Sequence, residues 1–478
     1  MELFHMNHRM LPYKLFYFFF FSGMSITPFM SVYFKQLGMN ASQIGIVSAA
    51  RPVAVALFQP VSGFLTDKWQ CPKITVVLGG AAWIGSAFVM GIAYPKPQQK
   101  SCTVIHDDLT VMQSNFSLIS ATAVRKTNSN IAESAANVST LISSPKYGFL
   151  NSDDFLEDKS WLYTTDSVRR IVYIFVIAYA LFGLGYVPLH SIADAESVNT
   201  LQEMDIDMAE YGRQRAFGSL GWGLAPLIFG MWMTISTGSV NICGITFTNT
   251  DFRPMFVVFV GFALGAVISM AFFSYKWHAE NKEETKGFEK GILLQLCSVP
   301  NMAVLLVMTF IGVCNGTVQG YLYWHLDNIG ASELIMALAS LCHSISEFLL
   351  GLVTGAATRQ FGYFPLMTVG ILTYLFRFII YAYIKQPWWI LGSELLHSLT
   401  FLLTWNTALS YLSLVIPQEF RTSLASLLNA LYLGLGNAIG YLMGGYLIDA
   451  YGSVATFHMH TFACGVVATL FVDSIYDN

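Results

Sequence analysis

Charged residues are scarce in this chain. Asp, Glu, Lys and Arg make up 11% of its 478 residues, whereas about 25% is usual in a soluble globular domain. This shortage excludes a soluble globule. Basic residues are not in excess either, because 25 Lys and Arg stand against 29 Asp and Glu. With no basic patch dense enough to neutralise a phosphate backbone, nucleic acid is excluded as a partner.

Cysteines are few and widely spaced. The seven cysteines include no CxxC pair, which excludes a disulfide scaffold, an iron–sulfur site and a structural zinc site. The sequence also contains no catalytic triad, metal cluster or phosphate-binding loop. We therefore expect a protein that is not an enzyme and needs no metal or cofactor.

Apolar residues make up 54% of the chain, and a membrane-spanning helix uses about 20 residues. Apolar runs of spanning length begin at twelve places, which are Leu11, Ile44, Lys73, Arg170, Arg215, Pro254, Val299, Leu334, Tyr363, Trp388, Thr422 and Ser453. The sequence predicts an all-α membrane protein with twelve transmembrane helices in the lipid bilayer. We expect the first run to be a span and not a cleaved leader.

Two polar segments divide the spans. Residues 95–168 separate the third span from the fourth, and the charged residues 276–290 separate the sixth from the seventh. Six spans on each side of a charged linker are typical of a duplicated transporter. We expect six-helix bundles over residues 1–275 and 291–478, around a central cavity.

Positive charges predict the orientation. Short segments on one side of the membrane carry eleven Lys and Arg, whereas the short loops on the other side carry only Lys35, Arg253 and Lys385. Positive charge in short loops resists translocation. We expect both termini in the cytoplasm, and the pattern does not distinguish the plasma membrane from an internal membrane.

This orientation places residues 95–168 outside. Glycosylation sequons begin at Asn115 and Asn137, where the lumenal enzyme has access to them; their occupancy stays open. Cys102 and Cys243 also fall outside, in a compartment where disulfides persist. They either form a disulfide or remain two unrelated thiols.

Ionisable groups inside spans cost several kcal/mol unless they face a partner or a water-filled cavity, so each is a functional candidate. Arg377 and Glu394 come at similar depth in consecutive spans, about 10 Å from the outer boundary at 1.5 Å per residue. They form either a structural salt bridge or part of a proton or substrate site. From spacing alone we interpret Asp194 and Arg215, near the expected ends of their spans, as loop charges. The six candidates, three of each sign, are Arg51, Asp194, Arg215, Glu347, Arg377 and Glu394.

Two histidines accompany these acids. His343 precedes Glu347 by four residues, and Glu394 precedes His397 by three. These spacings place each acid and imidazole on one face of a helix, where they can pass a proton. The span-ten face continues to Trp405.

Polar and small residues within spans predict close packing. Asn315 and Gln319 share one face of span seven and either join helices or line the cavity. Glycines at close spacing let helix backbones approach each other; they are Gly218, Gly221 and Gly223 in span five and Gly434, Gly436 and Gly440 in span eleven.

The segment Gly63-Phe64-Leu65-Thr66-Asp67-Lys68 at the end of span two resembles the loop signature G-x-L-x-D-R of the major facilitator superfamily, with Lys68 in place of Arg. A second segment, residues 211–222 (YGRQRAFGSLGW), resembles the span-five signature of the bacterial proton-coupled disaccharide permeases. The second Arg and the Trp contact sugar in that group. The resemblance implies that Arg215 and Trp222 line the cavity, which replaces the loop interpretation of Arg215.

Further matches resemble the animal associated-domain branch of the superfamily, of the type numbered six. They are Arg51-Pro52, Ser346-Glu347, Arg377, and Glu394-Leu395-Leu396-His397 followed by Phe401 and Trp405. The bacterial permeases carry a proton-binding Glu three residues after the span-ten His, where this chain has Thr400. That Glu394 replaces it is a hypothesis.

These observations predict a secondary-active transporter of a small polar solute, coupled to protons and working by alternating access. Movement of Arg377 between substrate and an acid would couple binding to protonation. The alternative is a receptor or sensor that binds a protein partner through its outer loop. We assign solute contacts to Arg51, Asp194, Arg215, Trp222, Asn315, Gln319 and Trp405, proton coupling to Glu347, Arg377, Glu394 and His397, and conformational control to Gly63, Asp67 and Lys68.

Overall fold

The computed structural model describes residues 9–69, 72–96, 163–205, 209–242, 245–273, 275, 296–416 and 421–476. The linker expected at residues 276–290 lies outside this part of the chain. So do nearly all of residues 95–168, with both sequons, and Cys102 and Cys243. The Gly63–Lys68 segment continues a helix, but its side chains are outside the described set.

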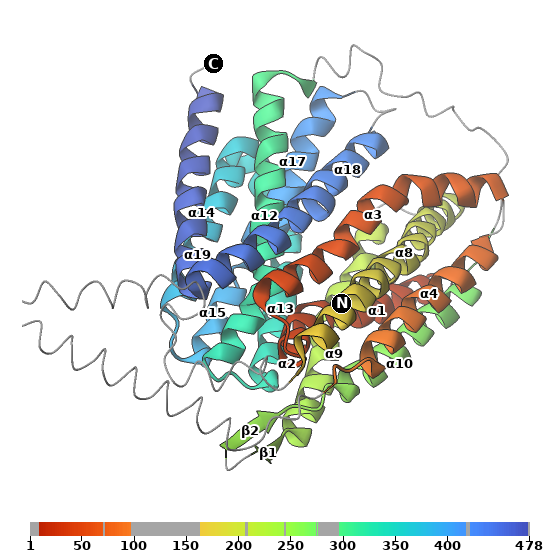
Figure 1. The fold of residues 1–478 in the computed structure, drawn as a ribbon. Helices are drawn as coiled ribbons and strands as arrows, with labels where there is room; N and C mark the ends of the chain where they lie inside the picture. The colour runs from red at the N-terminus through yellow and green to blue at the C-terminus, as the bar shows by residue number, and fades with distance from the viewer. Residues whose placement is uncertain are drawn as a thin grey trace, which may run out of the picture.

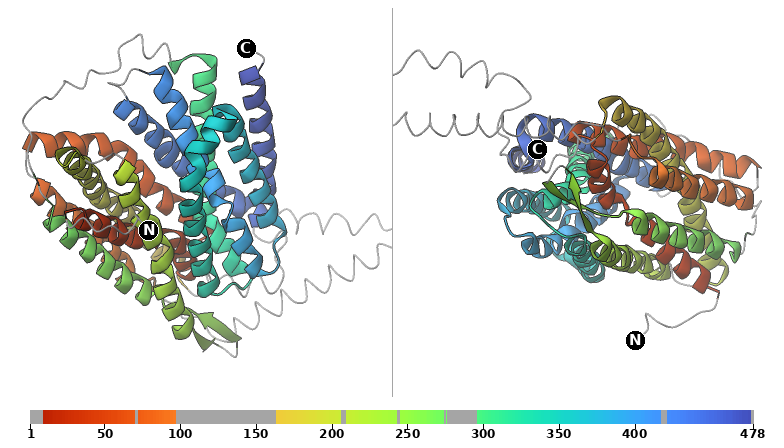
Figure 2. Two further views of the ribbon diagram at one scale, coloured as in Figure 1. Left: turned by 180° about the vertical axis from the view of Figure 1, so that it is seen from behind. Right: turned by 60° about the horizontal axis from the view of Figure 1, so that its bottom comes forward.

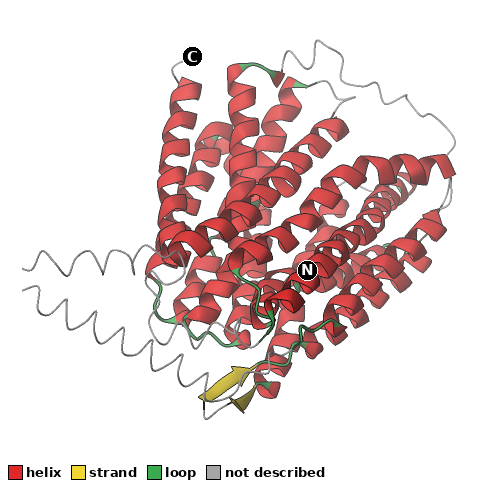
Figure 3. Cartoon of the chain, viewed as in Figure 1, coloured by secondary structure: helices red, strands yellow, loops and turns green. Residues whose placement is uncertain are grey.

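The N-terminal half consists of helices and a two-stranded β-hairpin between two of its helices. Its elements are α1 (Leu11–Met24), η2 (Thr27–Phe29), α2 (Met30–Gln36), α3 (Ala41–Trp69), α4 (Pro72–Ile92), α8 (Thr165–Glu203), α9 (Ala209–Ser236), β1 (Gly238–Ile242), β2 (Ile245–Asn249) and α10 (Arg253–Ala271). The two strands pair antiparallel, with Gly238 opposite Asn249. We call the end of the molecule with this hairpin the hairpin end (Figure 3).

The C-terminal half contains helices and connecting turns, and no strand among its described residues. It comprises α12 (Val299–Asn328), α13 (Glu333–Phe361), α14 (Tyr363–Tyr383), η4 (Pro387–Trp389), α15 (Ile390–Glu394), α16 (His397–Thr400), α17 (Leu402–Val415), α18 (Arg421–Asn429), the π-helix η6 (Ala430–Gly436) and α19 (Asn437–Tyr476). Figure 1 shows this half in cyan to blue beside the red-to-green N-terminal half, and Figure 2 shows the same division from behind.

The described helices agree with twelve spans. Ten helical stretches are long and apolar enough to cross a membrane. One of them, Leu424–Ile475, bends at Gly452, whose φ of 82° is not helical, and therefore crosses twice. The remaining span consists of α15, α16 and α17, which are individually too short to cross. The predicted all-α, twelve-helix, two-bundle membrane fold is confirmed.

Span ten differs from the expected single helix. Leu395 and Leu396 interrupt it between α15 and α16, and a second break separates α16 from α17 at Phe401. Irregular backbone at membrane depth is tolerated where it is buried in protein or lines a cavity. The break therefore marks this part of the span as an interior surface.

The most extensive contacts between the halves are made by two helix pairs: α9 packs along α13, and α3 along α19. Within the C-terminal half, glycines bring α12 and α19 into backbone contact. A Cβ added to Gly440 would lie 2.2 Å from the carbonyl oxygen of Val313, and one added to Gly316 would lie 2.4 Å from that of Asn437. The glycine packing expected in span eleven is thus confirmed.

Candidate functional site

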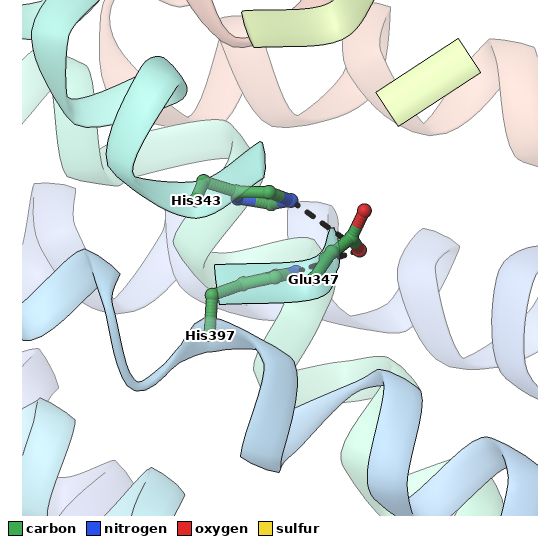
Figure 4. A group of neighbouring side chains, drawn as sticks. All are labelled: His343, Glu347 and His397. Carbon is green, nitrogen blue, oxygen red and sulfur yellow. Dashed lines mark ion pairs between the residues drawn. The ribbon is translucent and has the colours of Figure 1, made fainter. Parts of the chain in front are cut away.

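A cluster of acids and imidazoles lies inside the C-terminal half. On α13, His343 Nε2 lies 3.6 Å from Glu347 Oε1, as their four-residue spacing predicts. On α16, His397 Nε2 lies 3.9 Å from the same oxygen. The two imidazole rings stack, with centroids 3.4 Å apart and planes inclined by 22°. Figure 4 shows both rings directed toward the Glu347 carboxylate.

Arg377 of α14 is fully buried beside this cluster. Its Nη2 donates to Glu394 Oε1 at 2.8 Å, which confirms the pair expected from depth. Its Nη1 donates to Thr400 Oγ1 at 2.9 Å and to His397 Nδ1 at 3.2 Å, while its Nε donates to the Tyr381 hydroxyl at 2.9 Å. All three guanidinium nitrogens are therefore occupied.

The partner of Glu394 differs from the one that spacing suggests. The break after Glu394 separates it from His397, so the two do not form a pair on one helical face. Glu394 instead accepts from Arg377 and, at 2.8 Å, from the Tyr381 hydroxyl. Its second oxygen lies 3.8 Å from His343 Nδ1. His343 is thus the group between the two acids, which comes from tertiary packing and is not visible in spacing along one helix.

The cluster offers three donor groups of metal-binding type within 4.8 Å of one another, from His343, Glu347 and His397. Their hydrogen bonds do not suit a metal. A guanidinium is only a donor, so the bond from Arg377 requires a lone pair on His397 Nδ1 and places the proton of the neutral ring on Nε2. A metal ligand needs the opposite arrangement, with the second nitrogen donating. The arrangement suits hydrogen bonding and proton exchange.

A second polar group lies in the N-terminal half. Asp194 of α8 accepts from the Tyr17 hydroxyl at 2.6 Å, and its other oxygen lies 3.4 Å from His190 Nδ1. Arg215 of α9 lies close enough to Asp194 to interact electrostatically, and its Nη1 is 3.5 Å from the Tyr211 hydroxyl. The spacing-based interpretation of Asp194 and Arg215 as loop charges is wrong, because α8 and α9 extend beyond the expected span ends.

Helix α9 connects the two polar groups. Arg215, Ser219 and Trp222 follow one another at spacings of four and three residues, on one helical face. Ser219 Oγ donates to Glu347 Oε2 at 3.3 Å, and the Trp222 ring lies over His343 with centroids 6.2 Å apart. A face of the N-terminal half therefore contacts the acid and imidazole groups of the C-terminal half. Ser219 was not identified from the sequence.

Trp405 lies in an aromatic row that continues from the cluster. The His397 ring is 6.2 Å from Phe401, which is 6.4 Å from Trp405, as the span-ten face predicts. Tyr432 of η6 contacts both aromatic residues. The row thus extends an apolar surface from the titratable groups to span eleven.

Arg51 is buried at the contact of α3 with α8. Its guanidinium lies 5.8 Å from the centre of the Tyr179 ring, and its Nε has no hydrogen-bond partner among the described residues. A buried donor without a partner is uncommon.

Asn315 and Gln319 take part in contacts between helices. Asn315 Nδ2 donates to Asn437 Oδ1 at 3.0 Å beside the glycine contact of α12 with α19. The Tyr441 hydroxyl donates to Gln319 Oε1 at 3.4 Å. For buried Asn315 this placement favours the interhelical role over the solute contact that we also considered.

Contacts at the hairpin end hold the halves together. Lys35 Nζ of α2 lies 2.5 Å from Asp327 Oδ2 of α12. Asp449 of α19 accepts from the backbone nitrogens of Ala41 and Ser42, both at 2.9 Å, and so caps the first turn of α3. We call these two contacts the latch.

The sequence matches the model of the MFS_1 like family over residues 10–459. This chain belongs to that family. It is 23% identical over 465 residues to the major facilitator superfamily domain-containing protein 6-like of Danio rerio, covering 89% of this chain and 80% of the relative. It is 22% identical over 444 residues to the uncharacterised transporter YwbF of Bacillus subtilis, covering 91% and 86%. The chain spans about half the length of the Xenopus laevis and Homo sapiens relatives that it matches.

Solved structures share the fold. The nucleoside transporter NupG superposes with a TM-score of 0.69 at 12% identity, covering 98% of this chain and all of that one. A D-xylose-proton symporter superposes with a TM-score of 0.57 at 14% identity, covering 97% and 96%. The expected superfamily is confirmed, and the protein belongs to a family of multi-pass membrane transporters of small molecules, not to a family of enzymes.

Proposed function

We propose that this protein is a proton-coupled secondary transporter that moves a small polar solute by alternating access. The observation that carries the proposal is the junction at α9, where Ser219 and Trp222 contact the acid and imidazole groups of the other half and Arg215 lies on the same helical face. A solute bound at this junction touches both halves. Its binding therefore affects their relative movement and the protonation of the cluster.

The side chains around the junction favour a solute with hydroxyl or ionic groups. Arg215 is accessible, as expected of a group that meets a ligand, whereas Arg377 is buried and fully bonded. Trp222 and Trp405 are partly accessible and add flat apolar surfaces. A solute with a polar edge and an apolar face complements this combination. We retain Arg51 and Asp194 as proposed solute contacts on the N-terminal side.

The latch supports alternating access. It joins the halves at the hairpin end, on one side of the junction, through an ion pair and a cap that separation of the halves would break. Rocking of one bundle against the other around a fixed site is the usual mechanism for duplicated transporters. We propose that the structure is a state closed at the hairpin end.

A thermal stability screen tests solute binding. The purified protein is heated with a panel of sugars, nucleosides, amino acids and organic acids, and a true solute raises the melting temperature. Arg215→Ala should abolish this rise, while Arg213→Ala, on another face of α9, should retain it. A panel member that stabilises both variants equally would contradict the proposed site.

Uptake into liposomes tests proton coupling. With a stabilising solute identified, an imposed proton gradient should drive its accumulation, and Glu347→Gln should reduce that accumulation about tenfold or more because the carboxylate beside His343 is lost. Glu394→Gln tests the hypothesis that Glu394 replaces the proton-binding Glu of the bacterial permeases, and uptake at the wild-type rate in this variant would contradict it. Accumulation that ignores the proton gradient in the wild type would refute coupling.

The proposed orientation places both termini in the cytoplasm and residues 95–168 outside. Occupied sequons at Asn115 and Asn137 would shift in mobility after glycosidase treatment, and loss of the shift in Asn115→Gln and Asn137→Gln would confirm the assignment. Changed mobility of a lumenal fragment on reduction, absent in Cys102→Ser, would show pairing with Cys243. A protein that no metabolite stabilises and that binds a partner only through residues 95–168 would favour the receptor alternative.

A further inference from the structure

His343 lies between two carboxylates that belong to different elements. Its Nε2 is 3.6 Å from Glu347 on its own helix, and its Nδ1 is 3.8 Å from Glu394 on α15. A neutral imidazole carries one N–H and can donate to one of these acids, whereas an imidazolium carries two and can donate to both. The position of His343 therefore matches its protonated form.

His397 has the opposite environment. Arg377 Nη1 donates to its Nδ1, which must then hold a lone pair, so the ring is neutral while this bond exists. The His397 ring also stacks on His343 at 3.4 Å. Two imidazolium ions at this separation repel each other. One ring of the stack is charged at a time, and the bond from Arg377 assigns that charge to His343.

The charges of the cluster lead to the same assignment. Arg377 compensates Glu394, with which it pairs at 2.8 Å. An ionised Glu347 faces His343, the neutral His397 and the Ser219 hydroxyl. An uncompensated charge within a membrane is expensive. A proton on His343 brings the net charge of the cluster to zero.

We propose that His343 is the residue that binds the exchangeable proton, and that Arg377, Glu394 and His397 are positioning residues that keep the proton there. The groups that face His343 are Glu347 from α13, Glu394 from α15, His397 from α16 and Trp222 from α9. Binding adds one proton from water to the unprotonated ring nitrogen, and release returns it.

The contact with α9 connects this proton to movement of the halves. Trp222 covers one face of His343, and Ser219 donates to the acid beside it. Both belong to the N-terminal half. When the halves rock, these two residues withdraw and His343 gains contact with water. This coupling step rests on the proposed transport function, whereas the site of the proton does not.

Nuclear magnetic resonance of the full chain in lipid nanodiscs, with ¹⁵N-labelled histidine, tests the assignment directly. The chain has ten histidines, and the signals are assigned by single Asn variants, with the exposed surface residue His458 as the control. We expect the His343 signal to move between imidazole and imidazolium positions with pH. His397 should keep one protonated and one unprotonated nitrogen throughout. A titrating His397 beside a neutral His343 would overturn the proposal.

A second measurement detects the proton on His343 through the neighbouring ring of Trp222. An imidazolium quenches the fluorescence of a nearby indole, so a pH-dependent component of tryptophan emission should be present in the wild type and absent in Trp222→Phe. The same component should be lost in His343→Asn and retained in His458→Asn. Its persistence in His343→Asn would contradict the assignment.

The positioning role of Arg377 has its own readout. In Arg377→Lys the forked donor geometry is lost, which frees His397 Nδ1 and should let both imidazoles titrate. Unchanged titration would contradict this role. Proton binding is measured without any solute, so absence of transport would refute the proposed function and leave the His343 assignment intact. Proton-driven uptake that His343→Asn leaves unaltered would refute the assignment alone.

Discussion

Loss of the Asp449 carboxylate should open the hairpin end. Asp449 accepts two hydrogen bonds from the first backbone nitrogens of α3, and its negative charge lies at the positive end of that helix dipole. The acceptor belongs to one half of the molecule and the donors to the other. Its contribution therefore disappears when the halves separate and appears directly in the equilibrium between closed and open states.

The magnitude follows from the value of a helix cap. Replacing a capping Asp by Ala costs about 0.5–2 kcal/mol. At 1.36 kcal/mol for each factor of ten, Asp449→Ala should shift the ratio of open to closed molecules about 2- to 30-fold. Water replaces the lost acceptor where the helix start is accessible, which limits the effect to this range.

Distances between spin labels across the hairpin end measure this ratio. Labels at Lys96→Cys and Lys385→Cys, both exposed positions of opposite halves, are introduced after replacement of reactive native cysteines. Asp251 provides a matched control, because it accepts from the backbone nitrogen of Arg253 and so caps α10 of its own half. Asp449→Ala should enlarge the long-distance population and Asp251→Ala should not. Equal effects of both variants, or no effect of Asp449→Ala, would refute the reasoning.

Three further predictions concern stability and the latch. Arg377→Ala should lower the free energy of unfolding by about 3–5 kcal/mol, because the buried Glu394 carboxylate loses its guanidinium partner; addition of Glu394→Gln should restore part of it in thermal unfolding, and no restoration would contradict the pairing. Gly316→Ala should lower the melting temperature because its Cβ would lie 2.4 Å from the α19 backbone, whereas Gly261→Ala, with no atom of a described residue within 4 Å, should leave it unchanged. Lys35→Ala should enlarge the same long-distance population as Asp449→Ala, through a change of about 1 kcal/mol or less in the free-energy difference between open and closed states. High salt should weaken this effect, and a salt-independent change would contradict an ion pair.

Much of the fold follows from apolar run length. The spans expected at Leu11, Val299 and Tyr363 begin at those residues. The spans expected at Arg170 and Arg215 begin at Thr165 and Ala209, because polar and charged residues occupy their first turns. A hydropathy pattern assigns such residues to a loop, although a helix continues through them when its backbone hydrogen bonds remain satisfied.

The candidate site was only partly predictable. Depth arithmetic pairs Arg377 with Glu394 because both lie a few residues from the same end of consecutive spans. The helix break after Glu394 could not be predicted in this way, because periodicity assumes a continuous helix and Leu395 and Leu396 are residues that favour helix. The stack of His343 on His397 joins separate spans and depends on how α13 packs against α16. The hairpin between α9 and α10 was likewise not expected from its short strands.

The glycine contact between α12 and α19 has a mechanical consequence. Where the two backbones touch, α12 and α19 cannot slide past each other and must move as one rigid body. Asp327 belongs to α12 and Asp449 to α19, so both contacts of the latch move with the same rigid pair of helices. We expect the two contacts to break together, so that their energies add in one barrier. The glycine contact inside the C-terminal half thus makes opening of the hairpin end cooperative.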